Sequence, residues 1–251
     1  MGDKTFARFF DAQYHTFGED LNIWLSLAAV HGGPILELGC GTGRVVRALV
    51  QAGHPVIGID HDGHMLARAQ KLLAPFSLQN SCLVQADLQN FGFNLRFNLV
   101  IAAMNTLCTF DDTGLIAVFR NVSRHLAPDG LFAFELPNPA VDPFKGVDPN
   151  EPLTAFVEPE SGNPCQVYAQ RAEGPLQDRV EIVWHYDELL ADGSAQRYTL
   201  RQEYFLRSIE EIREFLERAN CTVIDAFGDY ARSPLEEDSE TMIVLARANP
   251  L

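Results

Sequence analysis

The hydrophobic pattern of the chain alternates short apolar runs with segments of helical spacing, beginning at residue 34. Residues 34–38 (PILEL) form an apolar run, and after a glycine turn apolar residues recur at helical intervals over 44–51. A second apolar run at 56–60 precedes a second helical segment at 64–73. The pattern predicts consecutive strand–helix units.

The same alternation continues for three more strands. Residues 82–86 and 97–102 (FNLVIA) are apolar runs, and the second lacks alternation, as is typical of a strand covered on both faces. A helix is predicted over 113–126, followed by the turn signal Pro128-Asp129-Gly130 and a fifth strand at 130–136. Strands joined by helices imply right-handed crossovers, a parallel sheet, and ligands at the carboxyl ends of the strands.

The pattern changes on both sides of this core. Residues 5–30 are helical in pattern and rich in aromatic residues, whereas 137–152 holds five prolines and is predicted as a loop. Alternating segments then predict hairpin strands at 155–158, 166–171, 180–188 and 196–205, with a turn at 191–194.

The last part of the chain returns to the helix-and-strand pattern. Ser208 and Glu211 have the spacing of a capping box and open a helix that runs to about Asn220. Two final strands are predicted at 221–228 and 241–247.

These segments predict an α/β protein in three parts. Residues 1–32 form a helical lid, and 33–136 with 208–251 form a Rossmann-like core with helices on both faces of a mostly parallel sheet. Residues 137–207 form a β-rich insertion at the carboxyl edge of that sheet. The insertion can roof a substrate pocket or pair with a second subunit in a homodimer.

Charge narrows the range of partners. The chain has 34 acidic and 19 basic residues and a formal net charge of −15. Nucleic-acid binding depends on Lys and Arg that displace counterions, so a nucleic acid or an anionic membrane is an unfavourable partner and a small molecule is expected. The N-terminus lacks the pattern of a signal peptide, and the five cysteines are widely spaced without a CxxC pair. We therefore expect a soluble, cytoplasmic protein with no disulfide framework and no metal site.

A glycine-rich turn follows the first predicted strand. In Glu37-Leu-Gly39-Cys-Gly41-Thr-Gly43, glycines allow backbone amides to approach a ligand that a Cβ would obstruct. The spacing is G-x-G-x-G, and no Lys-Ser or Lys-Thr pair follows, which argues against a phosphate-binding P-loop. Glu37, two residues before the first glycine, has no use in such a loop.

Two acidic residues follow the next two strands. Asp60 ends the second strand, 17 residues after Gly43, where it can accept hydrogen bonds from both hydroxyls of a ribose. Asp87 follows the third strand and can accept from an adenine amino group. Each has an ordinary alternative, a helix N-cap for Asp60 and a turn for Asp87. Together with the glycine turn, they predict a nucleoside-containing cofactor.

These motifs resemble those of the class I S-adenosylmethionine-dependent methyltransferases. The resemblance covers residues 33–136 and the last two strands, and its motifs are ILELGCGTGR (35–44), VIGIDHDGHMLARAQ (56–70), VQADLQNF (84–91) and FNLVIAAMNTLCTF (97–110). One departure is Asn98, where many relatives carry Asp. The resemblance implies a seven-stranded sheet whose last strand is antiparallel to the rest.

The resemblance also implies S-adenosylmethionine as cofactor and assigns its contacts. The glycines would lie under the methionine moiety, Asp60 would hold the ribose, and His61 and Met65 would flank the adenosine. Asp87 and Leu88 would hold the adenine, Ala103 and Met104 would border the sulfonium, and Tyr14 would close over the cofactor carboxylate. The implied cofactor-binding residues are Tyr14, Glu37, Gly39, Cys40, Gly41, Gly43, Asp60, His61, Met65, Asp87, Leu88, Ala103 and Met104. We interpret Cys40 as a small filler and not as a nucleophile.

Methyl transfer from a sulfonium is an in-line displacement that needs the acceptor atom about 3–3.5 Å from the methyl carbon. A general base is needed only when the acceptor is protonated. The catalytic candidates are Asn105, which can orient an acceptor or cap a helix, and His185, which can act as a base or simply be exposed. Strand alternation places His185 on one face of its strand and Trp184 and Tyr186 on the other face.

A second set of candidates concerns an anionic acceptor. Arg201, Tyr204 and Arg207 can anchor such a substrate or can lie on a solvated strand face.

Three readings of the whole chain compete. The favoured one is a methyltransferase acting on oxygen or nitrogen of a small molecule. The alternatives are a non-catalytic protein that binds an adenosyl ligand, and a nicotinamide-dependent oxidoreductase, which prefers G-x-G-x-x-G. A nucleic-acid methyltransferase is disfavoured by the charge and because Ala103-Met104-Asn105-Thr106 stands where Asn-Pro-Pro-Tyr would be expected.

Overall fold

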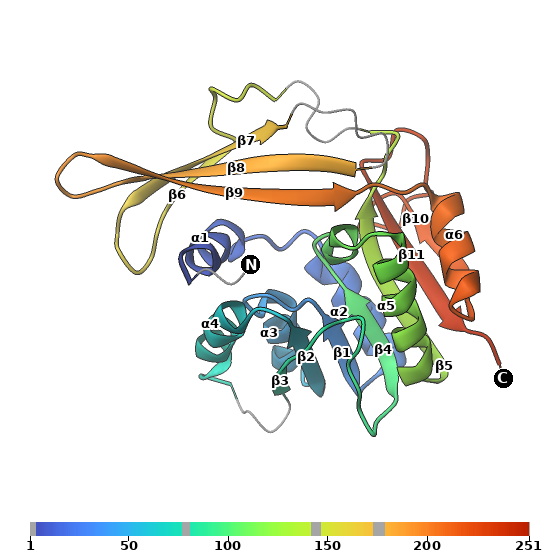
Figure 1. Cartoon of the computed structure of the whole chain (residues 1–251). Coiled ribbons are helices and arrows are strands. Elements are labelled where there is room, and N and C mark those ends of the chain that lie inside the picture. Colours follow the sequence, from blue (N-terminus) through green and yellow to red (C-terminus); the bar gives the residue numbers. More distant parts are fainter. Residues whose placement is uncertain (1–3, 77–80, 142–146, 173–178, 251) are drawn as a thin grey trace.

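A seven-stranded sheet forms the centre of the protein (Figure 1). The computed structural model describes residues 4–76, 81–141, 147–172 and 179–250. The strands lie in the order β10-β11-β5-β4-β1-β2-β3, and β11 alone runs antiparallel to its neighbours. Their bounds are β1 (Ile35–Leu38), β2 (Val56–Asp60), β3 (Ser81–Gln85), β4 (Phe97–Ala102), β5 (Leu126–Pro137), β10 (Cys221–Phe227) and β11 (Thr241–Ala248). The predicted Rossmann-like sheet with its antiparallel last strand is confirmed.

Helices cover both faces of this sheet. On one face, side chains of α2 (Leu21–His31), α3 (Arg44–Gln51) and α4 (Gly63–Leu73) pack against alternate strand residues such as Ile35 and Ile101. On the other face, α5 (Asp112–His125) and α6 (Ile209–Arg218) pack against residues such as Leu36 and Phe132. Burial on both faces explains why the central strands are apolar without alternation.

Local signals set several element boundaries where the sequence predicted them. Helix α3 and strands β2 and β4 have the predicted bounds. Ser208 and Glu211 form the predicted capping box at the start of α6. These features depend on residues close together in sequence, so the pattern alone is sufficient to place them.

Two segments differ from the prediction by more than two residues. The helical pattern over 5–30 is two helices, α1 (Lys4–Tyr14) and α2, with a turn between them. Strand β5 begins at Leu126 and not at 130, because Leu126 pairs with Phe97 before the register shifts. Asp129, at a left-handed φ of 63°, lies in that shifted segment.

A second, four-stranded antiparallel sheet is formed by the insertion. Its strands lie in the order β6-β7-β8-β9, and the predicted hairpins are confirmed. Their bounds are β6 (Thr154–Val157), β7 (Pro164–Arg171), β8 (Arg179–Leu189) and β9 (Ala195–Phe205). Figure 1 shows this insertion sheet lying across the end of the core, with α1 between the two. The Phe9 ring of α1 stacks on Tyr186 of β8 with centroids 5.1 Å apart.

Candidate functional site

The glycine turn between β1 and α3 is a close-packed cradle. Gly39, Gly41 and Gly43 have φ values of 65°, 51° and 86°, a region that side-chain-bearing residues seldom adopt. A Cβ on Gly39 would collide with the Thr106 side chain, and one on Gly43 would lie 3.0 Å from Cβ of Ala69. Backbone conformation therefore favours glycine at all three positions, as the motif predicts, and close packing adds to this at Gly39 and Gly43.

Asp60 connects the end of β2 to this loop. Its carboxylate accepts hydrogen bonds of 2.9 Å from the backbone N–H of Gly41 and of Asp62. The helix that follows is capped by Asp62, whose side chain accepts from His64 N–H at 2.7 Å. The N-cap alternative for Asp60 is therefore wrong, and the carboxylate lies at the glycine loop, where a ribose ligand is predicted.

The residues predicted around adenosine lie near that carboxylate. Met65 is buried on α4, and His61 is exposed, with Nδ1 3.4 Å from Asp60. Asp87 accepts from Gln89 N–H at 2.9 Å, so it forms the predicted turn. Leu88 beside it is 5% exposed. Their roles toward adenine stay predictions.

The turn after β4 is the most unusual backbone in the site. Met104 and Asn105 are both left-handed, with φ of 53° and 56°. Asn105 precedes the short 3₁₀ helix η2 (Thr106–Thr109), yet its side chain makes no cap hydrogen bond. Its Oδ1 is buried and has no hydrogen-bond partner among the described residues. Side-chain capping therefore does not account for Asn105, and non-glycine residues in this conformation are characteristic of functional sites.

Behind the glycine loop lies a group of buried ionisable side chains, of which the sequence predicted only Glu37 as a site residue. The Arg44 guanidinium donates two hydrogen bonds of 2.6 Å to Asp20. Burial raises the pKa of Glu37 to about 8 and that of Glu135 to about 7. The Glu135 carboxylate accepts from Met104 N–H and from the Tyr230 hydroxyl.

The sequence contains little evidence that these residues form a buried group. Arg44 belongs to the glycine motif and Asp20 precedes an apolar helix. A contact between residues 24 positions apart cannot be read from either feature.

Helix α1 closes the site from above. Phe10 is the residue nearest to where a Cβ on Gly41 would be, at 3.8 Å, and its ring lies 4.7 Å from that of Tyr14. Burial raises the pKa of Tyr14. The predicted lid residue Tyr14 is therefore close to the glycine loop, and Phe10, one helical turn earlier in the same Phe9-Phe10-Asp11-x-x-Tyr14 motif, is closer still.

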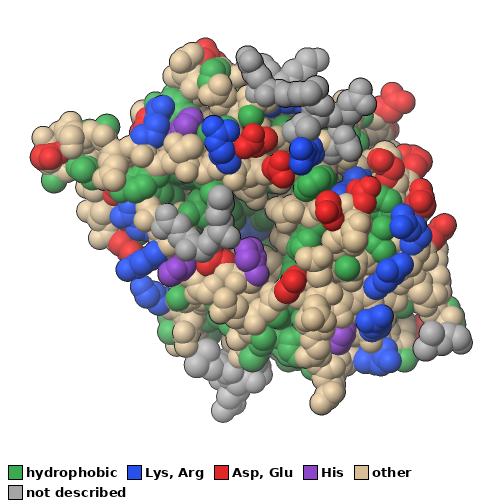
Figure 2. Space-filling model, in the orientation of Figure 1, with side chains coloured by type: hydrophobic (Ala, Val, Ile, Leu, Met, Phe, Trp, Pro, Cys, Tyr) green, Lys and Arg blue, Asp and Glu red, His purple; other side chains and the backbone are tan. Residues whose placement is uncertain are grey.

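The insertion sheet adds aromatic side chains to the same space. Tyr186 packs on α1, and its hydroxyl donates to Gln13 at 3.0 Å. Strand alternation and the β8–β9 register place Trp184 and Tyr204 on this inner face. The Trp184 and Tyr204 side chains are hydrogen-bonded to each other. Burial raises the pKa of the Tyr204 phenol, and the nearby Tyr14 raises it further. Figure 2 shows hydrophobic side chains beneath the insertion sheet, where the surface is recessed.

The other candidate site residues predicted on the insertion, His185 and Arg201, lie on the outer face of its sheet. His185 lies on the outer face, with Nδ1 2.8 Å from the Thr199 hydroxyl, so the structure does not bring it to the glycine loop. Burial and the Arg197 guanidinium lower its pKa. Arg201 shares that outer face and pairs with Glu181 at 3.3 Å.

Arg207 is neither solvated nor free to hold an anionic substrate. It is 5% exposed, bonded to Asp112 at 2.9 Å and to the Phe110 carbonyl at 2.7 Å.

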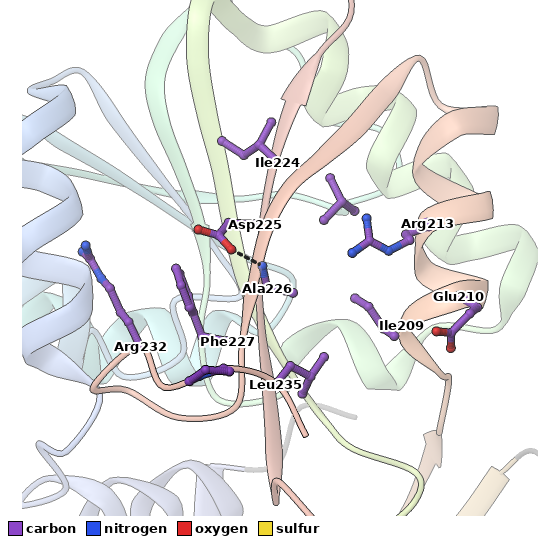
Figure 3. A pocket seen from close by; sticks show the side chains of 11 residues that line it. Ile209, Glu210, Arg213, Ile224, Asp225, Ala226, Phe227, Arg232 and Leu235 are labelled. Atoms are coloured by element: carbon purple, nitrogen blue, oxygen red, sulfur yellow. Dashed lines mark hydrogen bonds between the residues drawn. The ribbon is translucent and has the colours of Figure 1, made fainter. Parts of the chain in front are cut away.

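A separate groove lies at the far edge of the sheet (Figure 3). It has a volume of about 570 Å³ and lies between α6, edge strand β10 and the loop that follows. Its lining residues are Ile209, Glu210, Arg213, Val223, Ile224, Asp225, Ala226, Phe227, Arg232, Pro234 and Leu235. None of the residues assigned to the cofactor lines it, and three strands separate β10 from β1. We do not assign it to the methyl-transfer site.

Further observations concern metals, thiols and membranes. Within the described ranges no group of three His, Cys, Asp or Glu side chains is arranged to hold a metal ion. All five cysteines are free thiols. In the same part of the chain, every helix is too short or too polar to cross a bilayer.

Comparison with protein families and curated proteins identifies methyltransferases. Residues 35–130 match the family described as Methyltransferase domain. The chain is 25% identical over 230 residues to a cypemycin N-terminal methyltransferase of a Streptomyces species, which covers 91% of this chain and 89% of that protein. The family match spans the glycine loop, Asp60, Asp87 and the Met104–Asn105 turn.

Solved structures with the same fold are also methyltransferases. A S-adenosylmethionine-dependent methyltransferase from Clostridium acetobutylicum ATCC 824 superposes with a TM-score of 0.79 at 18% identity, over 98% of both chains. The sugar N-methyltransferase KedS8 from Streptoalloteichus sp ATCC 53650 gives 0.74 at 17% identity, over 99% of this chain and 94% of that one. CalS10, an amino pentose methyltransferase from Micromonospora echinaspora, gives 0.70 at 18% identity, over 96% and 97%. The likeness extends through the insertion as well as the core.

Proposed function

The chain is an S-adenosylmethionine-dependent methyltransferase of the Rossmann-like class I family, and on that premise we propose that it methylates an amine nitrogen of a small molecule. The residues fit the cofactor: the three glycines have left-handed backbone conformations, a Cβ would be crowded at Gly39 and Gly43, and the Asp60 carboxylate lies beside them. S-adenosylmethionine supplies an electrophilic methyl group. The protein must position the acceptor and exclude water.

The observation that carries the amine proposal is that three aromatic side chains, Tyr14, Trp184 and Tyr204, lie close together beneath the insertion sheet. When a neutral amine attacks a methyl group, positive charge develops on nitrogen. Aromatic faces stabilise such a charge. The nitrogen then loses a proton to solvent, so this reaction needs no strong base.

An alcohol acceptor makes a different demand, because its proton must be removed as the bond forms. His185, the histidine proposed from sequence as a base, lies on the outer face of the insertion sheet. The phenols of Tyr14 and Tyr204 have raised pKa values and remain protonated at neutral pH. The arrangement therefore favours nitrogen over oxygen.

Charge and likeness support the same class of acceptor. A net charge of −15 attracts cationic amines, which lose one proton to solvent before they attack as neutral amines, and it repels nucleic acid. Proteins similar to this chain include an N-terminal methyltransferase, a sugar N-methyltransferase and an amino pentose methyltransferase. We extend the proposal to the insertion: residues 137–207 act as a substrate lid, with Trp184 and Tyr204 on its inner face.

The test is a panel of paired acceptors with S-adenosylmethionine carrying a labelled methyl group. Each amino sugar or peptide with a free N-terminus is paired with its hydroxyl counterpart. We expect labelled N-methyl product from amines only, strongly reduced turnover for Trp184→Ala, and unchanged turnover for His185→Ala as the matched control on the outer face. Transfer to the hydroxyl members, or loss of turnover in His185→Ala, would refute the proposal.

A further inference from the structure

Two buried carboxyl groups lie behind the glycine loop on strands that flank β4. Glu37 on β1 is 3% exposed, and Glu135 on β5 is 2% exposed. Both project to the face covered by α2 and α3, since Ile35 and Ala133, two residues earlier on each strand, belong to that core. The carboxyl groups therefore approach the site from beneath the sheet's carboxyl edge.

Each of these groups keeps an oxygen without a partner. Oε2 of Glu37 and Oε2 of Glu135 are buried and have no hydrogen-bond partner among the described residues, and Oδ1 of Asn105 is in the same state. Buried acceptors in proteins are nearly always hydrogen-bonded. Three such atoms around the glycine loop and the Met104–Asn105 turn indicate a region built to face positive charge.

The nearby cation neutralises them only in part. Arg44 is engaged in the bidentate pair with Asp20, which is completely buried. Arg44 lowers the pKa of Glu37 more than Asp20 raises it, but burial outweighs both, so ionised Glu37 and Glu135 add negative charge that the pair offsets only in part. Glu135 also accepts a hydrogen bond from Met104 N–H. Its carboxyl group therefore directly contacts the turn that is predicted to border the sulfonium.

We propose that Glu37 and Glu135 are specificity-determining residues that favour the positively charged sulfonium of S-adenosylmethionine over the neutral thioether of S-adenosylhomocysteine. The two ligands share every group except the transferred methyl and its charge. A carboxylate in a poorly solvated region discriminates between them by Coulomb attraction, which acts without direct contact. The consequence is easier exchange of product for fresh cofactor. This inference rests on the methyltransferase function and not on the identity of the acceptor.

The test is calorimetric titration with S-adenosylmethionine, S-adenosylhomocysteine and sinefungin, in which a carbon bearing an amino group replaces the methylsulfonium. The quantity of interest is the ratio of the Kd for S-adenosylhomocysteine to that for S-adenosylmethionine. At pH 8.5, where both carboxyl groups are mostly ionised, we expect Glu37→Gln and Glu135→Gln each to lower this ratio about fivefold, with sinefungin following S-adenosylmethionine. Glu217→Gln, the same change at an exposed position of α6, should leave the ratio unchanged.

If the two glutamates had only a structural role, their substitution would reduce the affinity for all three ligands equally. That result would overturn the proposal. Retention of the ratio in Glu135→Asp, which keeps the charge, would support it. Absence of S-adenosylmethionine and S-adenosylhomocysteine binding to the wild type would refute the cofactor assignment together with this inference. Transfer to oxygen in the acceptor panel would refute only the amine proposal.

A measurement on the unmodified protein covers the case in which a Gln variant does not fold. Because the pKa values of Glu37 and Glu135 are raised, the affinity ratio should be higher at pH 8.5 than at pH 6. The other ionisable groups that face them are Asp20, Cys40, Arg44, Asp60, Cys108 and Tyr230. The thiols and the phenol have raised pKa values and stay neutral over this range. A ratio that does not change with pH would contradict the proposal.

Discussion

The guanidinium of Arg44 is bound edge-on to the carboxylate of Asp20 through two hydrogen bonds of 2.6 Å, which join the first residue of α3 to the residue before α2. Asp20 also accepts from the Trp24 indole at 2.9 Å, and Arg44 donates to the Phe17 carbonyl at 3.1 Å. The turn between α1 and α2 is therefore fixed to the helix that follows the glycine loop, and α1 is positioned over the site from this anchor.

Removal of one partner should be severe because the other charge stays buried. We expect Asp20→Ala to lower the free energy of unfolding by about 3–5 kcal/mol. The measurement is denaturant unfolding. The control is Glu214→Gln, which breaks an exposed pair with Arg218 at 3.8 Å and should change stability by less than about 0.5 kcal/mol. Equal effects of the two changes would contradict the buried-pair interpretation.

Gly39 should tolerate no side chain. Its φ is 65° and a Cβ would meet the Thr106 side chain, so Gly39→Ala must displace the η2 turn from the glycine loop. We expect S-adenosylhomocysteine affinity to fall by at least about tenfold. Gly92→Ala is the matched control, since no atom lies within 4 Å of the added Cβ. The prediction fails if both variants bind alike.

Asp60 and Asp62 lie on one turn but should have separable roles. Loss of a charge-assisted hydrogen bond predicts that Asp60→Ala weakens S-adenosylhomocysteine binding by about 1.5–3 kcal/mol in calorimetry. Asp62 caps α4 through His64 N–H, so Asp62→Ala should lower stability by about 1 kcal/mol and leave affinity nearly unchanged. Unchanged affinity in Asp60→Ala would remove the ribose assignment.

Arg8 should hold the lid helix against the insertion. Its guanidinium lies 2.7 Å from Glu188 and 3.5 Å from Glu158, whose side chains are 3% and 0% exposed. Arg8→Met leaves both carboxylates buried without a cation, so we expect hydrogen exchange in α1 to accelerate about tenfold or more. Lys71→Met, which removes an exposed contact with Glu160 at 3.7 Å, should leave exchange in α1 as it is. Equal protection of α1 from hydrogen exchange in both variants would show that Arg8 does not hold α1 against the insertion sheet.

The buried carboxyl groups should make stability depend on pH. The folded pKa values of Glu37 and Glu135, about 8 and about 7, exceed the ordinary value of 4.5. The folded state therefore binds protons more tightly, and the free energy of unfolding should fall as pH rises from about 5 to about 8. Thermal unfolding should show a smaller fall for Glu135→Gln than for the wild type, whereas Glu217→Gln should match the wild type. An identical slope in Glu135→Gln would show that Glu135 does not titrate in this range.

Much of the core followed from sequence because its signals act over short distances. The bounds of α3, β2 and β4 follow from the spacing of apolar residues within each segment, and the Ser208–Glu211 box lies within four residues. The glycine positions follow from backbone conformation, which is a local property. The turn at 15–20 could not be predicted from the sequence, because it is held by hydrogen bonds to Arg44, which lies more than 20 residues further along the chain.

The sequence by itself determined the order of strands and helices, the glycine cradle and the acidic residue at the end of β2. Only the tertiary structure placed Phe10 against Gly41, Glu135 beneath Met104, and Trp184 and Tyr204 on the inner face of the insertion sheet. It also directed His185 outward. Residue patterns report which face of a helix or strand is buried, but not which distant element covers that face, because this depends on how the whole chain packs.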